Sequence, residues 1–583
     1  MVCFFITHFL LCREGHPHSS SASQPPSPLQ SNREGLLVLL TVVIYDILIT
    51  EVAAMGMYLN PSNDGFKQAL RSQIYVDKTG MIEFFNRILD TEQKFAAVSR
   101  ARRFGKSMAV KLLVAYYSKG CDSRELFKGL KAETLPSFES ELNKSNVITF
   151  DVQNFRSFAK NEGRPLETLA YIQKEVIKEL RSAYPQYVTD EDISLPTVLA
   201  RINQNTKEQF IIIIDEWDCI FREEKNNKQA QEEYINFLRA MFKGQQAESF
   251  VKLAYMTGIL PIKKYGTQSA LNNFKEYTMV SPDQLTEYVG FTEGEVKALC
   301  QRFDMDFEEC KRWYDGYSFE TQKSVYNPNS VVEAMLRHKF NSYWTKTDTY
   351  EVLRDYIGMN IDGLRDDIIT MLNGDSCLIK TESFQNDMVT INSKNDVMTL
   401  LVHLGYLAYD SVTRSVRIPN EEIAGEFAIA VEEQKAWGDV ATAIGNSDQF
   451  LKAIIKGDTS FICHQLSVVH EEASKLSYNN EIVLASTINL AFYTSFRFYT
   501  VFRELDSGKG FADMVYLPKP GCPYPALLIE LKYNESTETA LNQIKEKRYT
   551  GRLTHYLDNL LMVGINYDKE TKKHSCIIET NKV

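Results

Sequence analysis

The stretch Ile211-Ile212-Ile213-Ile214-Asp215-Glu216 decides the fold, because it places four consecutive isoleucines directly before two acids. A continuous β-branched run predicts a strand that is buried on both faces, as in a parallel sheet covered by helices. The two carboxylates then follow the carboxyl end of the strand. The stretch therefore predicts an α/β domain with an acidic site at one edge of its sheet.

A second stretch, Gly105-Lys106-Ser107, supplies groups that bind phosphate. The residues before it predict a short buried strand (KFAAVS) and a turn (RARRFG), and the residues after it predict a helix. This strand, loop and helix order is typical of a phosphate-binding loop, which directs backbone N–H groups at phosphate oxygens. We expect Lys106 to contact the β- and γ-phosphates and Ser107 to ligate Mg²⁺.

Together the two stretches predict binding of ATP with Mg²⁺, in which Asp215 holds the metal and Glu216 polarises the attacking water. Arg100 stands where the pattern GxxxxGK[ST] has its first glycine, and a non-glycine residue resists the positive φ that such loops often use. The alternative interpretation is that GKS is a chance tripeptide in a surface turn and that the isoleucine strand simply ends in solvent.

The run SRARRFGKSM resembles the phosphate loop of a bacterial AAA-ATPase-like family whose members carry a C-terminal domain of the PD-(D/E)xK nuclease superfamily. That family generally lacks the first glycine too, although it usually has proline at the position of Ala101. Further matches, over about residues 57–583, are YVDKT (75–79), MTGIL (256–260), NN (272–273), WYDGY (313–317) and YNP (326–328).

The resemblance implies a P-loop NTPase sheet with helices on both faces. The expected nucleotide-binding residues are Arg102, Arg103, Phe104, Gly105, Lys106, Ser107, Asp215 and Thr257. In related ATPases a polar residue at the end of such a strand senses the γ-phosphate, which makes Thr257 the candidate here. The alternative for Thr257 is a hydroxyl that only terminates its strand.

The chain has 583 residues, too many for a single core, and its composition (44% hydrophobic, 24% charged) is that of a globular protein. We expect an N-terminal extension that is poorly ordered or mispredicted (1–55), an AAA-ATPase-like domain (56–284), a helical lid with a winged-helix-like connector (285–425) and a nuclease-like domain with a restriction-endonuclease-like α/β fold (426–583). Capping boxes at Thr292 and Ser330 predict helix starts in the lid. For the winged-helix-like unit we favour a connecting role over DNA binding.

The apolar run of residues 36–50 is shorter than the roughly 20 residues of a membrane-spanning helix, and Asp46 interrupts it. We therefore expect no membrane span, translation that starts at Met55 or Met57, and a cytoplasmic protein; a signal anchor is the alternative. The ten cysteines form no CxxC pair, which fits a reducing compartment. The net charge of −11 argues against a protein coated with nucleic acid but permits a local basic groove.

Asp513, Glu530 and Lys532 form a second expected site. They lie on two predicted strands (FADMVY and LLIELK) joined by a turn rich in proline and glycine. The midpoint between the acids falls between Gly521 and Cys522, so a symmetric hairpin places the two carboxylates opposite each other. Cross-strand partners lie about 5 Å apart, where Mg²⁺ relieves the repulsion between two carboxylates.

These residues match the D…ExK arrangement of the nuclease superfamily. Asp513 and Glu530 are expected to ligate Mg²⁺ and Lys532 to orient the attacking water. The resemblance adds Glu481 as a third acid of the metal site. A following basic helix around Lys545 suits a phosphodiester backbone. Alternatively, these carboxylates only solvate the edge of the sheet.

The sequence thus predicts an AAA-like ATPase coupled to a Mg²⁺-dependent nuclease-type domain that acts on DNA or another nucleic acid. The expected catalytic residues are Glu216, Asp513, Glu530 and Lys532. The alternative is a nucleotide-gated binding or scaffold protein in which one or both sites are inactive. An oligomer is compatible with the sequence.

Overall fold

The computed structural model describes residues 56–583 apart from residues 165–166, 263, 266–267, 289, 320–321, 323, 345–347, 360, 387–388, 435–436, 475–487, 490, 507–510, 520, 547–553 and 581–583. The expectations for residues 1–55, including the apolar run and the start at Met55, and for Glu481 therefore fall outside the described residues. Within the described part, no helix has the length and apolar character needed to cross a membrane.

A five-stranded parallel sheet forms the centre of the region before residue 284, as predicted. Its strand order is β2-β3-β4-β1-β7, so the strand before the phosphate loop (β1) and the isoleucine strand (β3) are both interior and flank β4. The strands are β1 (Phe95–Ser99), β2 (Asn146–Asp151), β3 (Phe210–Asp215), β4 (Val251–Gly258) and β7 (Lys275–Tyr277). Since all five run in parallel, their carboxyl ends share one edge.

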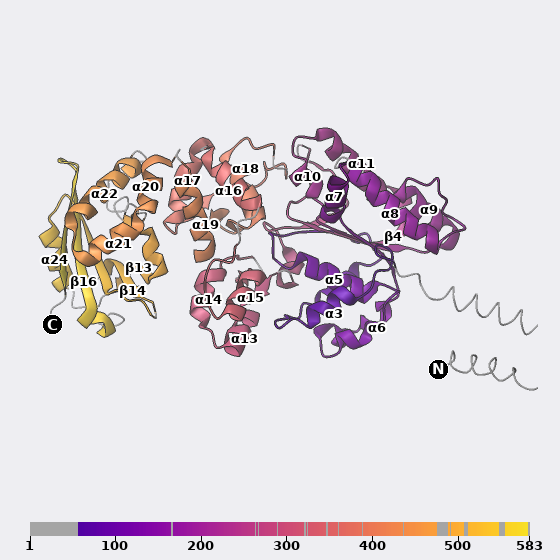
Figure 1. Cartoon of the computed structure of the whole chain (residues 1–583), viewed down its shortest axis with the longest axis horizontal. Helices are drawn as coiled ribbons and strands as arrows, with labels where there is room; N and C mark the ends of the chain where they lie inside the picture. Colours follow the sequence, from indigo (N-terminus) through magenta and orange to yellow (C-terminus); the bar gives the residue numbers. More distant parts are fainter. Residues whose placement is uncertain are drawn as a thin grey trace, which may run out of the picture. The chain divides into compact units, whose positions relative to one another are not determined.

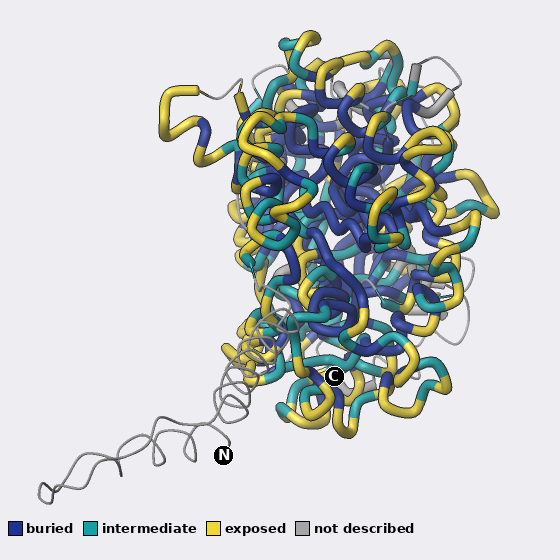
Figure 2. Tube along the Cα trace, turned by 90° about the vertical axis from the view of Figure 1, so that its right-hand side faces the viewer, coloured by how far each residue is buried: buried dark blue, intermediate teal, exposed yellow. Residues whose placement is uncertain are grey.

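The isoleucines of β3 alternate between two hydrophobic layers, one on each face of the sheet. Ile211 and Ile213 belong to the layer of the phosphate-loop helix, whereas Ile212 and Ile214 belong to the opposite layer, and all four are at most 1% exposed. Figure 1 shows α3 and α5 on one side of the sheet and α7 to α11 on the other. Figure 2 shows the buried residues gathered inside and the exposed ones at loops and helix surfaces.

The helices of these layers have the following bounds. The first layer contains α3 (Asp64–Leu70), α4 (Met81–Ile88), α5 (Lys106–Tyr117) and α6 (Phe138–Glu141). The second contains α7 (Val152–Asn161), α8 (Thr168–Ala183), α9 (Leu195–Thr206), α10 (Cys219–Glu223), α11 (Lys228–Phe242) and α12 (Gln245–Phe250).

A helical region with its own apolar cluster follows the sheet. It contains β8 (Phe291–Thr292), α13 (Glu293–Phe303), α14 (Phe307–Tyr314), β9 (Val325–Tyr326) and α15 (Pro328–Arg337). The capping box predicted at Thr292 is present, with Glu295 as its partner. The one predicted at Ser330 is wrong: α15 begins earlier because Asn327 caps it and Pro328, which lacks an N–H, fits the first helical position.

The next segment contains α16 (Asp348–Gly358), α17 (Leu364–Leu372), α18 (Lys394–Leu404), α19 (Glu421–Glu432) and a small antiparallel sheet of β10 (Cys377–Leu378), β11 (Ala408–Asp410) and β12 (Ser415–Arg417). Helix α18 starts at Lys394, because Ser393 and Asp396 form a capping box there. Glu422 fastens α19 to the preceding region, since its carboxylate accepts hydrogen bonds from the backbone N–H of Tyr343 and Trp344 and from the hydroxyl of Ser330.

Four residues, which we call the loop clasp, connect the phosphate loop to later parts of the chain. They are Ala101 and Phe104 of the loop, together with Tyr317 and Gly405. The rings of Phe104 and Tyr317 meet edge to face, with centroids 5.1 Å apart. The Tyr317 hydroxyl donates to the Gly405 carbonyl oxygen at 2.6 Å. Gly405 ends α18 with a φ of +88° and lies so close to Ala101 that a Cβ there would be 2.6 Å from the Ala101 Cβ. The clasp therefore joins the loop to the helix α18 that follows much later in the chain.

The C-terminal region holds a mixed five-stranded sheet of order β13-β14-β15-β16-β17. Its elements are α20 (Gly438–Gly445), α21 (Ser447–Lys456), α22 (Thr459–Ser474), β13 (Tyr499–Asp506), β14 (Phe511–Pro518), β15 (Ala526–Tyr533), α24 (Thr537–Glu546), β16 (Leu560–Asp568) and β17 (Lys573–Thr580). Strands β15 and β16 are parallel, and the other neighbours are antiparallel. The sheet agrees with the expected α/β fold.

We predict that Gly405→Ala lowers the free energy of unfolding by about 2–4 kcal/mol, as the sum of left-handed strain and overpacking against Ala101. The matched control is Gly374→Ala, because Gly374 has a φ of +90° but no atom within 4 Å of a built Cβ. The control should lose only about 1 kcal/mol in the same urea titration. Equal losses for the two variants would show that the clasp is loosely packed.

Candidate functional site

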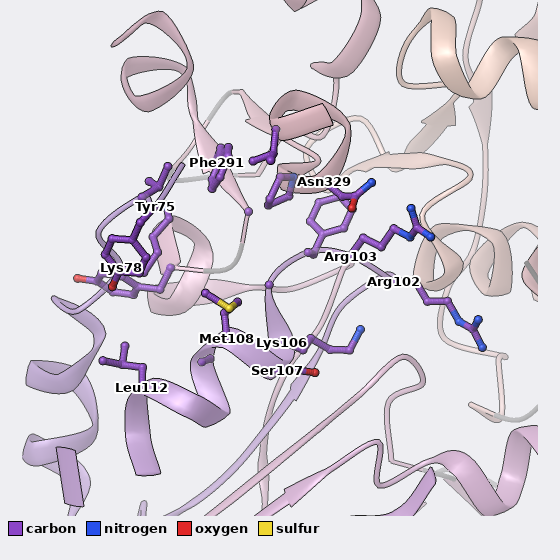
Figure 3. Close-up of a pocket in the computed structure, with 18 of the residues that line it drawn as sticks. Tyr75, Lys78, Arg102, Arg103, Lys106, Ser107, Met108, Leu112, Phe291 and Asn329 are labelled. Atoms are coloured by element: carbon purple, nitrogen blue, oxygen red, sulfur yellow. The ribbon is translucent and has the colours of Figure 1, made fainter. Parts of the chain in front are cut away.

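A cavity of about 770 Å³ lies beside the phosphate loop, at the carboxyl edge of the parallel sheet. Figure 3 shows Lys106 and Ser107 at one end of this cavity and Tyr75, Lys78, Leu112 and Phe291 at the other, with Met108 between them. One end is thus polar and the other largely apolar. The volume is within the range, roughly 300–1,000 Å³, of pockets that bind small molecules.

The backbone of the phosphate loop contains two residues with a positive φ. Arg103 has a φ of +68° and Gly105 a φ of +83°, both in the left-handed region. Left-handed residues within such a turn direct successive N–H groups into one concavity, which binds anions. Helix α5 starts directly after Gly105, so its N-terminus faces the same space. Arg102, Arg103, Phe104, Gly105, Lys106 and Ser107 all line the cavity.

Arg100 occupies the first-glycine position without needing a glycine's conformation, because its φ is not positive. Its side chain is 1% exposed, and its guanidinium donates to the carbonyl oxygens of Ser99 and Tyr277 at 3.0 and 2.9 Å. Burial lowers the pKa of Arg100 to about 10. The residue therefore ties the start of the loop to the sheet, and the missing glycine does not distort the loop.

Lys106 is 5% exposed, and its ammonium donates to two loop carbonyl oxygens, those of Arg100 at 2.9 Å and Ala101 at 3.0 Å. Burial lowers the pKa of Lys106, while the nearby carboxylates of Glu216 and Asp215 act in the opposite direction. The ammonium thus lies among acids at the polar end of the cavity, where the sequence predicts phosphate.

Asp215 ends β3 and is 6% exposed, within hydrogen-bonding reach of Ser107. Burial raises the pKa of Asp215 to about 6; Ser107 opposes the rise, and the neighbouring acids Glu216 and Asp151 add to it. Among the described residues there is no cluster of three or more metal-ligating side chains. A magnesium site completed by substrate phosphates and water needs only one or two carboxylates, so Asp215 with the Ser107 hydroxyl fits such a site.

Glu216 follows β3 with a φ of +50° and lines the cavity. Its carboxylate forms an ion pair with Arg222, which the sequence analysis did not single out. Thr257 is placed differently: its hydroxyl is fully buried and donates to the Val98 carbonyl oxygen at 2.9 Å. It does not line the cavity, and this geometry favours the alternative in which Thr257 only terminates its strand.

Asp151, Gln153 and Lys78 are cavity residues that the sequence analysis did not name as site candidates. Asp151 ends β2, is paired with Asp215 across the sheet, and lies beside Gln153 in the cavity wall. Burial raises the pKa of Asp151. The signal was available, since Asp151 directly follows the strand-forming run VITF (147–150) in the sequence. Lys78, from the YVDKT match, lines the apolar end and pairs with Glu295 of α13 at 2.6 Å.

The C-terminal strands have the register that the sequence predicts. Met514 pairs with Ile529 and Tyr516 with Leu527, so the next residues along the two strands are Asp513 and Glu530. Glu530 is fully buried, and its Oε1 lies 3.7 Å from the Lys532 ammonium. The side chain of Asp513 is outside the described part of the structure, and Glu481 is outside it altogether. The described residues therefore supply one carboxylate and one lysine of the second expected site.

Two protein-family models match separate parts of the chain. Residues 65–267 match the family described as "Predicted AAA-ATPase", and residues 479–576 match the "PD-(D/E)XK nuclease superfamily". No curated protein matches the chain. The solved structures that match include the ORC2 protein of Aeropyrum pernix in ADPNP and ADP complexes, with a TM-score of 0.27 and 9% identity, over 62% of this chain and 96% of its own.

We predict that the Mg²⁺-dependent part of nucleotide affinity weakens as the pH falls below about 6. Asp215 has a raised pKa, so its carboxyl is protonated below that pH, and a proton then competes with the metal. Between pH 7.5 and pH 5 the loss should be about tenfold.

The measurement is titration calorimetry of an ATP analogue, with and without Mg²⁺, across that pH range. Asp215→Asn is the control, since it keeps the pH dependence of the nucleotide itself and removes that of the carboxyl. Identical pH profiles for wild type and variant would contradict a role for Asp215 in metal binding.

Proposed function

We propose that this chain, which carries a predicted AAA-ATPase domain and a PD-(D/E)XK nuclease superfamily domain, binds and hydrolyses ATP with Mg²⁺ and thereby controls a C-terminal nuclease-type site. One observation supports the proposed binding and hydrolysis of ATP. A buried ammonium, a hydroxyl and an acid, from Lys106, Ser107 and Glu216, line the polar end of a cavity whose other end is largely apolar, and Asp215 lies next to them within hydrogen-bonding reach of Ser107.

The phosphate end acts through the loop. Its N–H groups and the Lys106 ammonium stabilise phosphate charge, and phosphate oxygens would replace the two loop carbonyls that Lys106 now contacts. Asp215 and Ser107 would hold Mg²⁺, which when bound neutralises charge on the phosphates. Glu216, one residue beyond Asp215, would orient and deprotonate the attacking water.

The opposite end suits a nucleobase. Tyr75, Met108, Leu112, Phe291 and Val332 supply aromatic and aliphatic surface there. Flat aromatic ligands bind such surfaces through stacking and burial of apolar area. The wall includes residues of β8 and α15, so a bound base would contact the helical lid as well as the sheet domain.

For the C-terminal region we propose Mg²⁺-dependent cleavage of nucleic acid by Asp513, Glu530 and Lys532, with Glu481 as a further metal ligand. The hairpin register and the Glu530–Lys532 contact support this proposal.

We also propose the domain limits 56–284, 285–425 and 426–583 and a cytoplasmic location. Packing of α22 on β17, where Ser467 Oγ lies 3.1 Å from His574 Nδ1, supports a boundary well before residue 479.

For ATP hydrolysis we predict that Lys106→Ala abolishes detectable nucleotide binding, since it removes the buried charge that faces the phosphates. Glu216→Gln should bind ATP within about twofold of wild type and hydrolyse it at least about 10²-fold more slowly, as loss of a general base implies. Phosphate release and calorimetry on the full chain check both. Hydrolysis by Glu216→Gln at the wild-type rate would refute its role.

For the nuclease-type site we predict that Asp513→Ala and Lys532→Ala each abolish Mg²⁺-dependent cleavage of nucleic acid and leave ATP hydrolysis unchanged. Lys573→Ala is the matched control, because Lys573 is an exposed lysine at the start of β17, the edge strand of the same sheet. Single- and double-stranded DNA and RNA are tested with and without ATP. If wild type cuts none of them but still binds nucleotide, the scaffold alternative replaces the nuclease proposal.

A further inference from the structure

Arg222 is a buried guanidinium next to the proposed hydrolytic site but outside the cavity wall. It lies on α10, directly after the isoleucine strand, and its side chain is 6% exposed. Its Nη2 donates to Glu216 Oε2, and its Nε donates to Asp218 Oδ2 at 3.0 Å. One cation therefore bridges two acids that precede it in the chain. Of the three, only Glu216 lines the cavity.

Asp218 fixes the guanidinium in place. Its side chain is fully buried, and Oδ2 also accepts the backbone N–H groups of Ile259 and Leu260 at 3.1 and 2.8 Å. Those two residues directly follow β4, the strand between β1 and β3. The anchor of Arg222 is thus tied to the same sheet edge that carries the phosphate loop, and the guanidinium has no room to swing away without leaving a buried charge unpaired.

The ion pair determines where the Glu216 carboxylate lies. A free glutamate side chain has several rotamers, and fixing it in one of them costs conformational entropy. Here one carboxylate oxygen is held by Arg222 while the residue still lines the cavity, so the second oxygen, Oε1, is the one available to a water. The left-handed backbone of Glu216, with a φ of +50°, adds to this fixed placement.

We propose that Arg222 is a positioning residue, which holds Glu216 at the cavity so that its free oxygen can receive the proton of the attacking water. This inference rests on the proposed ATP hydrolysis and deepens it. Arg222 does not touch the nucleotide. Its removal therefore affects turnover and leaves nucleotide binding intact, because a mispositioned catalytic group lowers rate without changing the phosphate contacts.

The test compares Arg222→Gln, Arg222→Lys, Glu216→Gln and the double variant Arg222→Gln/Glu216→Gln in the full chain. Arg222→Gln should lower kcat about 10- to 100-fold, with KM and the calorimetric Kd for ATP within twofold of wild type. Arg222→Lys, which keeps the charge, should recover part of that loss. In the Glu216→Gln background, Arg222→Gln should lower kcat no further, because there is then no base to position.

Arg156→Gln is the matched control for simple destabilisation. Arg156 is a comparably buried arginine, 12% exposed, that packs against the end of α10 and pairs with Glu223 and Glu224 at 3.4 and 2.9 Å, neither of which lines the cavity. It should lower the Tm as Arg222→Gln does but keep the wild-type kcat.

Three results would overturn the proposal: a kcat of Arg222→Gln within threefold of wild type, parallel losses of kcat and ATP affinity, or a further loss of kcat in the double variant. A wild type that hydrolyses no ATP would instead refute the proposed hydrolysis itself, and the positioning role with it. The two failures are thus distinguished by the wild-type rate.

Discussion

The nucleotide site depends on one physical constraint, the buried ammonium of Lys106, whose hydrogen bonds go to backbone carbonyl oxygens. Lys106 is 5% exposed and is solvated by two backbone carbonyl oxygens of its own loop, with Asp215 and Glu216 nearby. Removing an ion from water costs several kcal/mol even after the protein relaxes. The surrounding loop, sheet edge and acids must therefore be held rigidly enough to keep that charge in place, ready for phosphate.

Two sets of contacts hold the phosphate loop in place. Arg100 anchors the start of the loop to the sheet edge through the carbonyl oxygens of Ser99 and Tyr277. The loop clasp holds the rest, because Phe104 packs on Tyr317 and Ala101 packs on Gly405 at the end of α18. The loop is thus in direct contact with the C-terminal end of α18.

The sequence was informative where a local pattern has one structural outcome. Four isoleucines before two acids required a doubly buried parallel strand, and the alternation of Ile211 and Ile213 against Ile212 and Ile214 is the result. The spacing around Gly521 also predicted the β14–β15 register, because a hairpin pairs residues symmetrically about its turn.

Local sequence patterns did not predict features that depend on contacts between residues far apart in the chain. The residues around Gly405 do not indicate that it contacts Ala101, which lies more than 300 residues earlier in the chain. Arg222 likewise resembles any other arginine in the sequence, and only the structure shows that Asp218 and the end of β4 surround it. The predicted cap at Ser330 failed for a local reason, since Asn327 followed by proline is the stronger start signal. Thr257 was an inference from related ATPases, and its hydroxyl binds Val98 instead of facing the cavity.

The most direct measurement is a crystal structure of the full chain with Mg²⁺ and a non-hydrolysable ATP analogue. The account predicts that the Lys106 ammonium leaves the carbonyl oxygens of Arg100 and Ala101 for the β- and γ-phosphates, with the base between Tyr75 and Phe291. An analogue bound elsewhere, or a Lys106 that still contacts both carbonyls while phosphates lie beyond its reach, would contradict it.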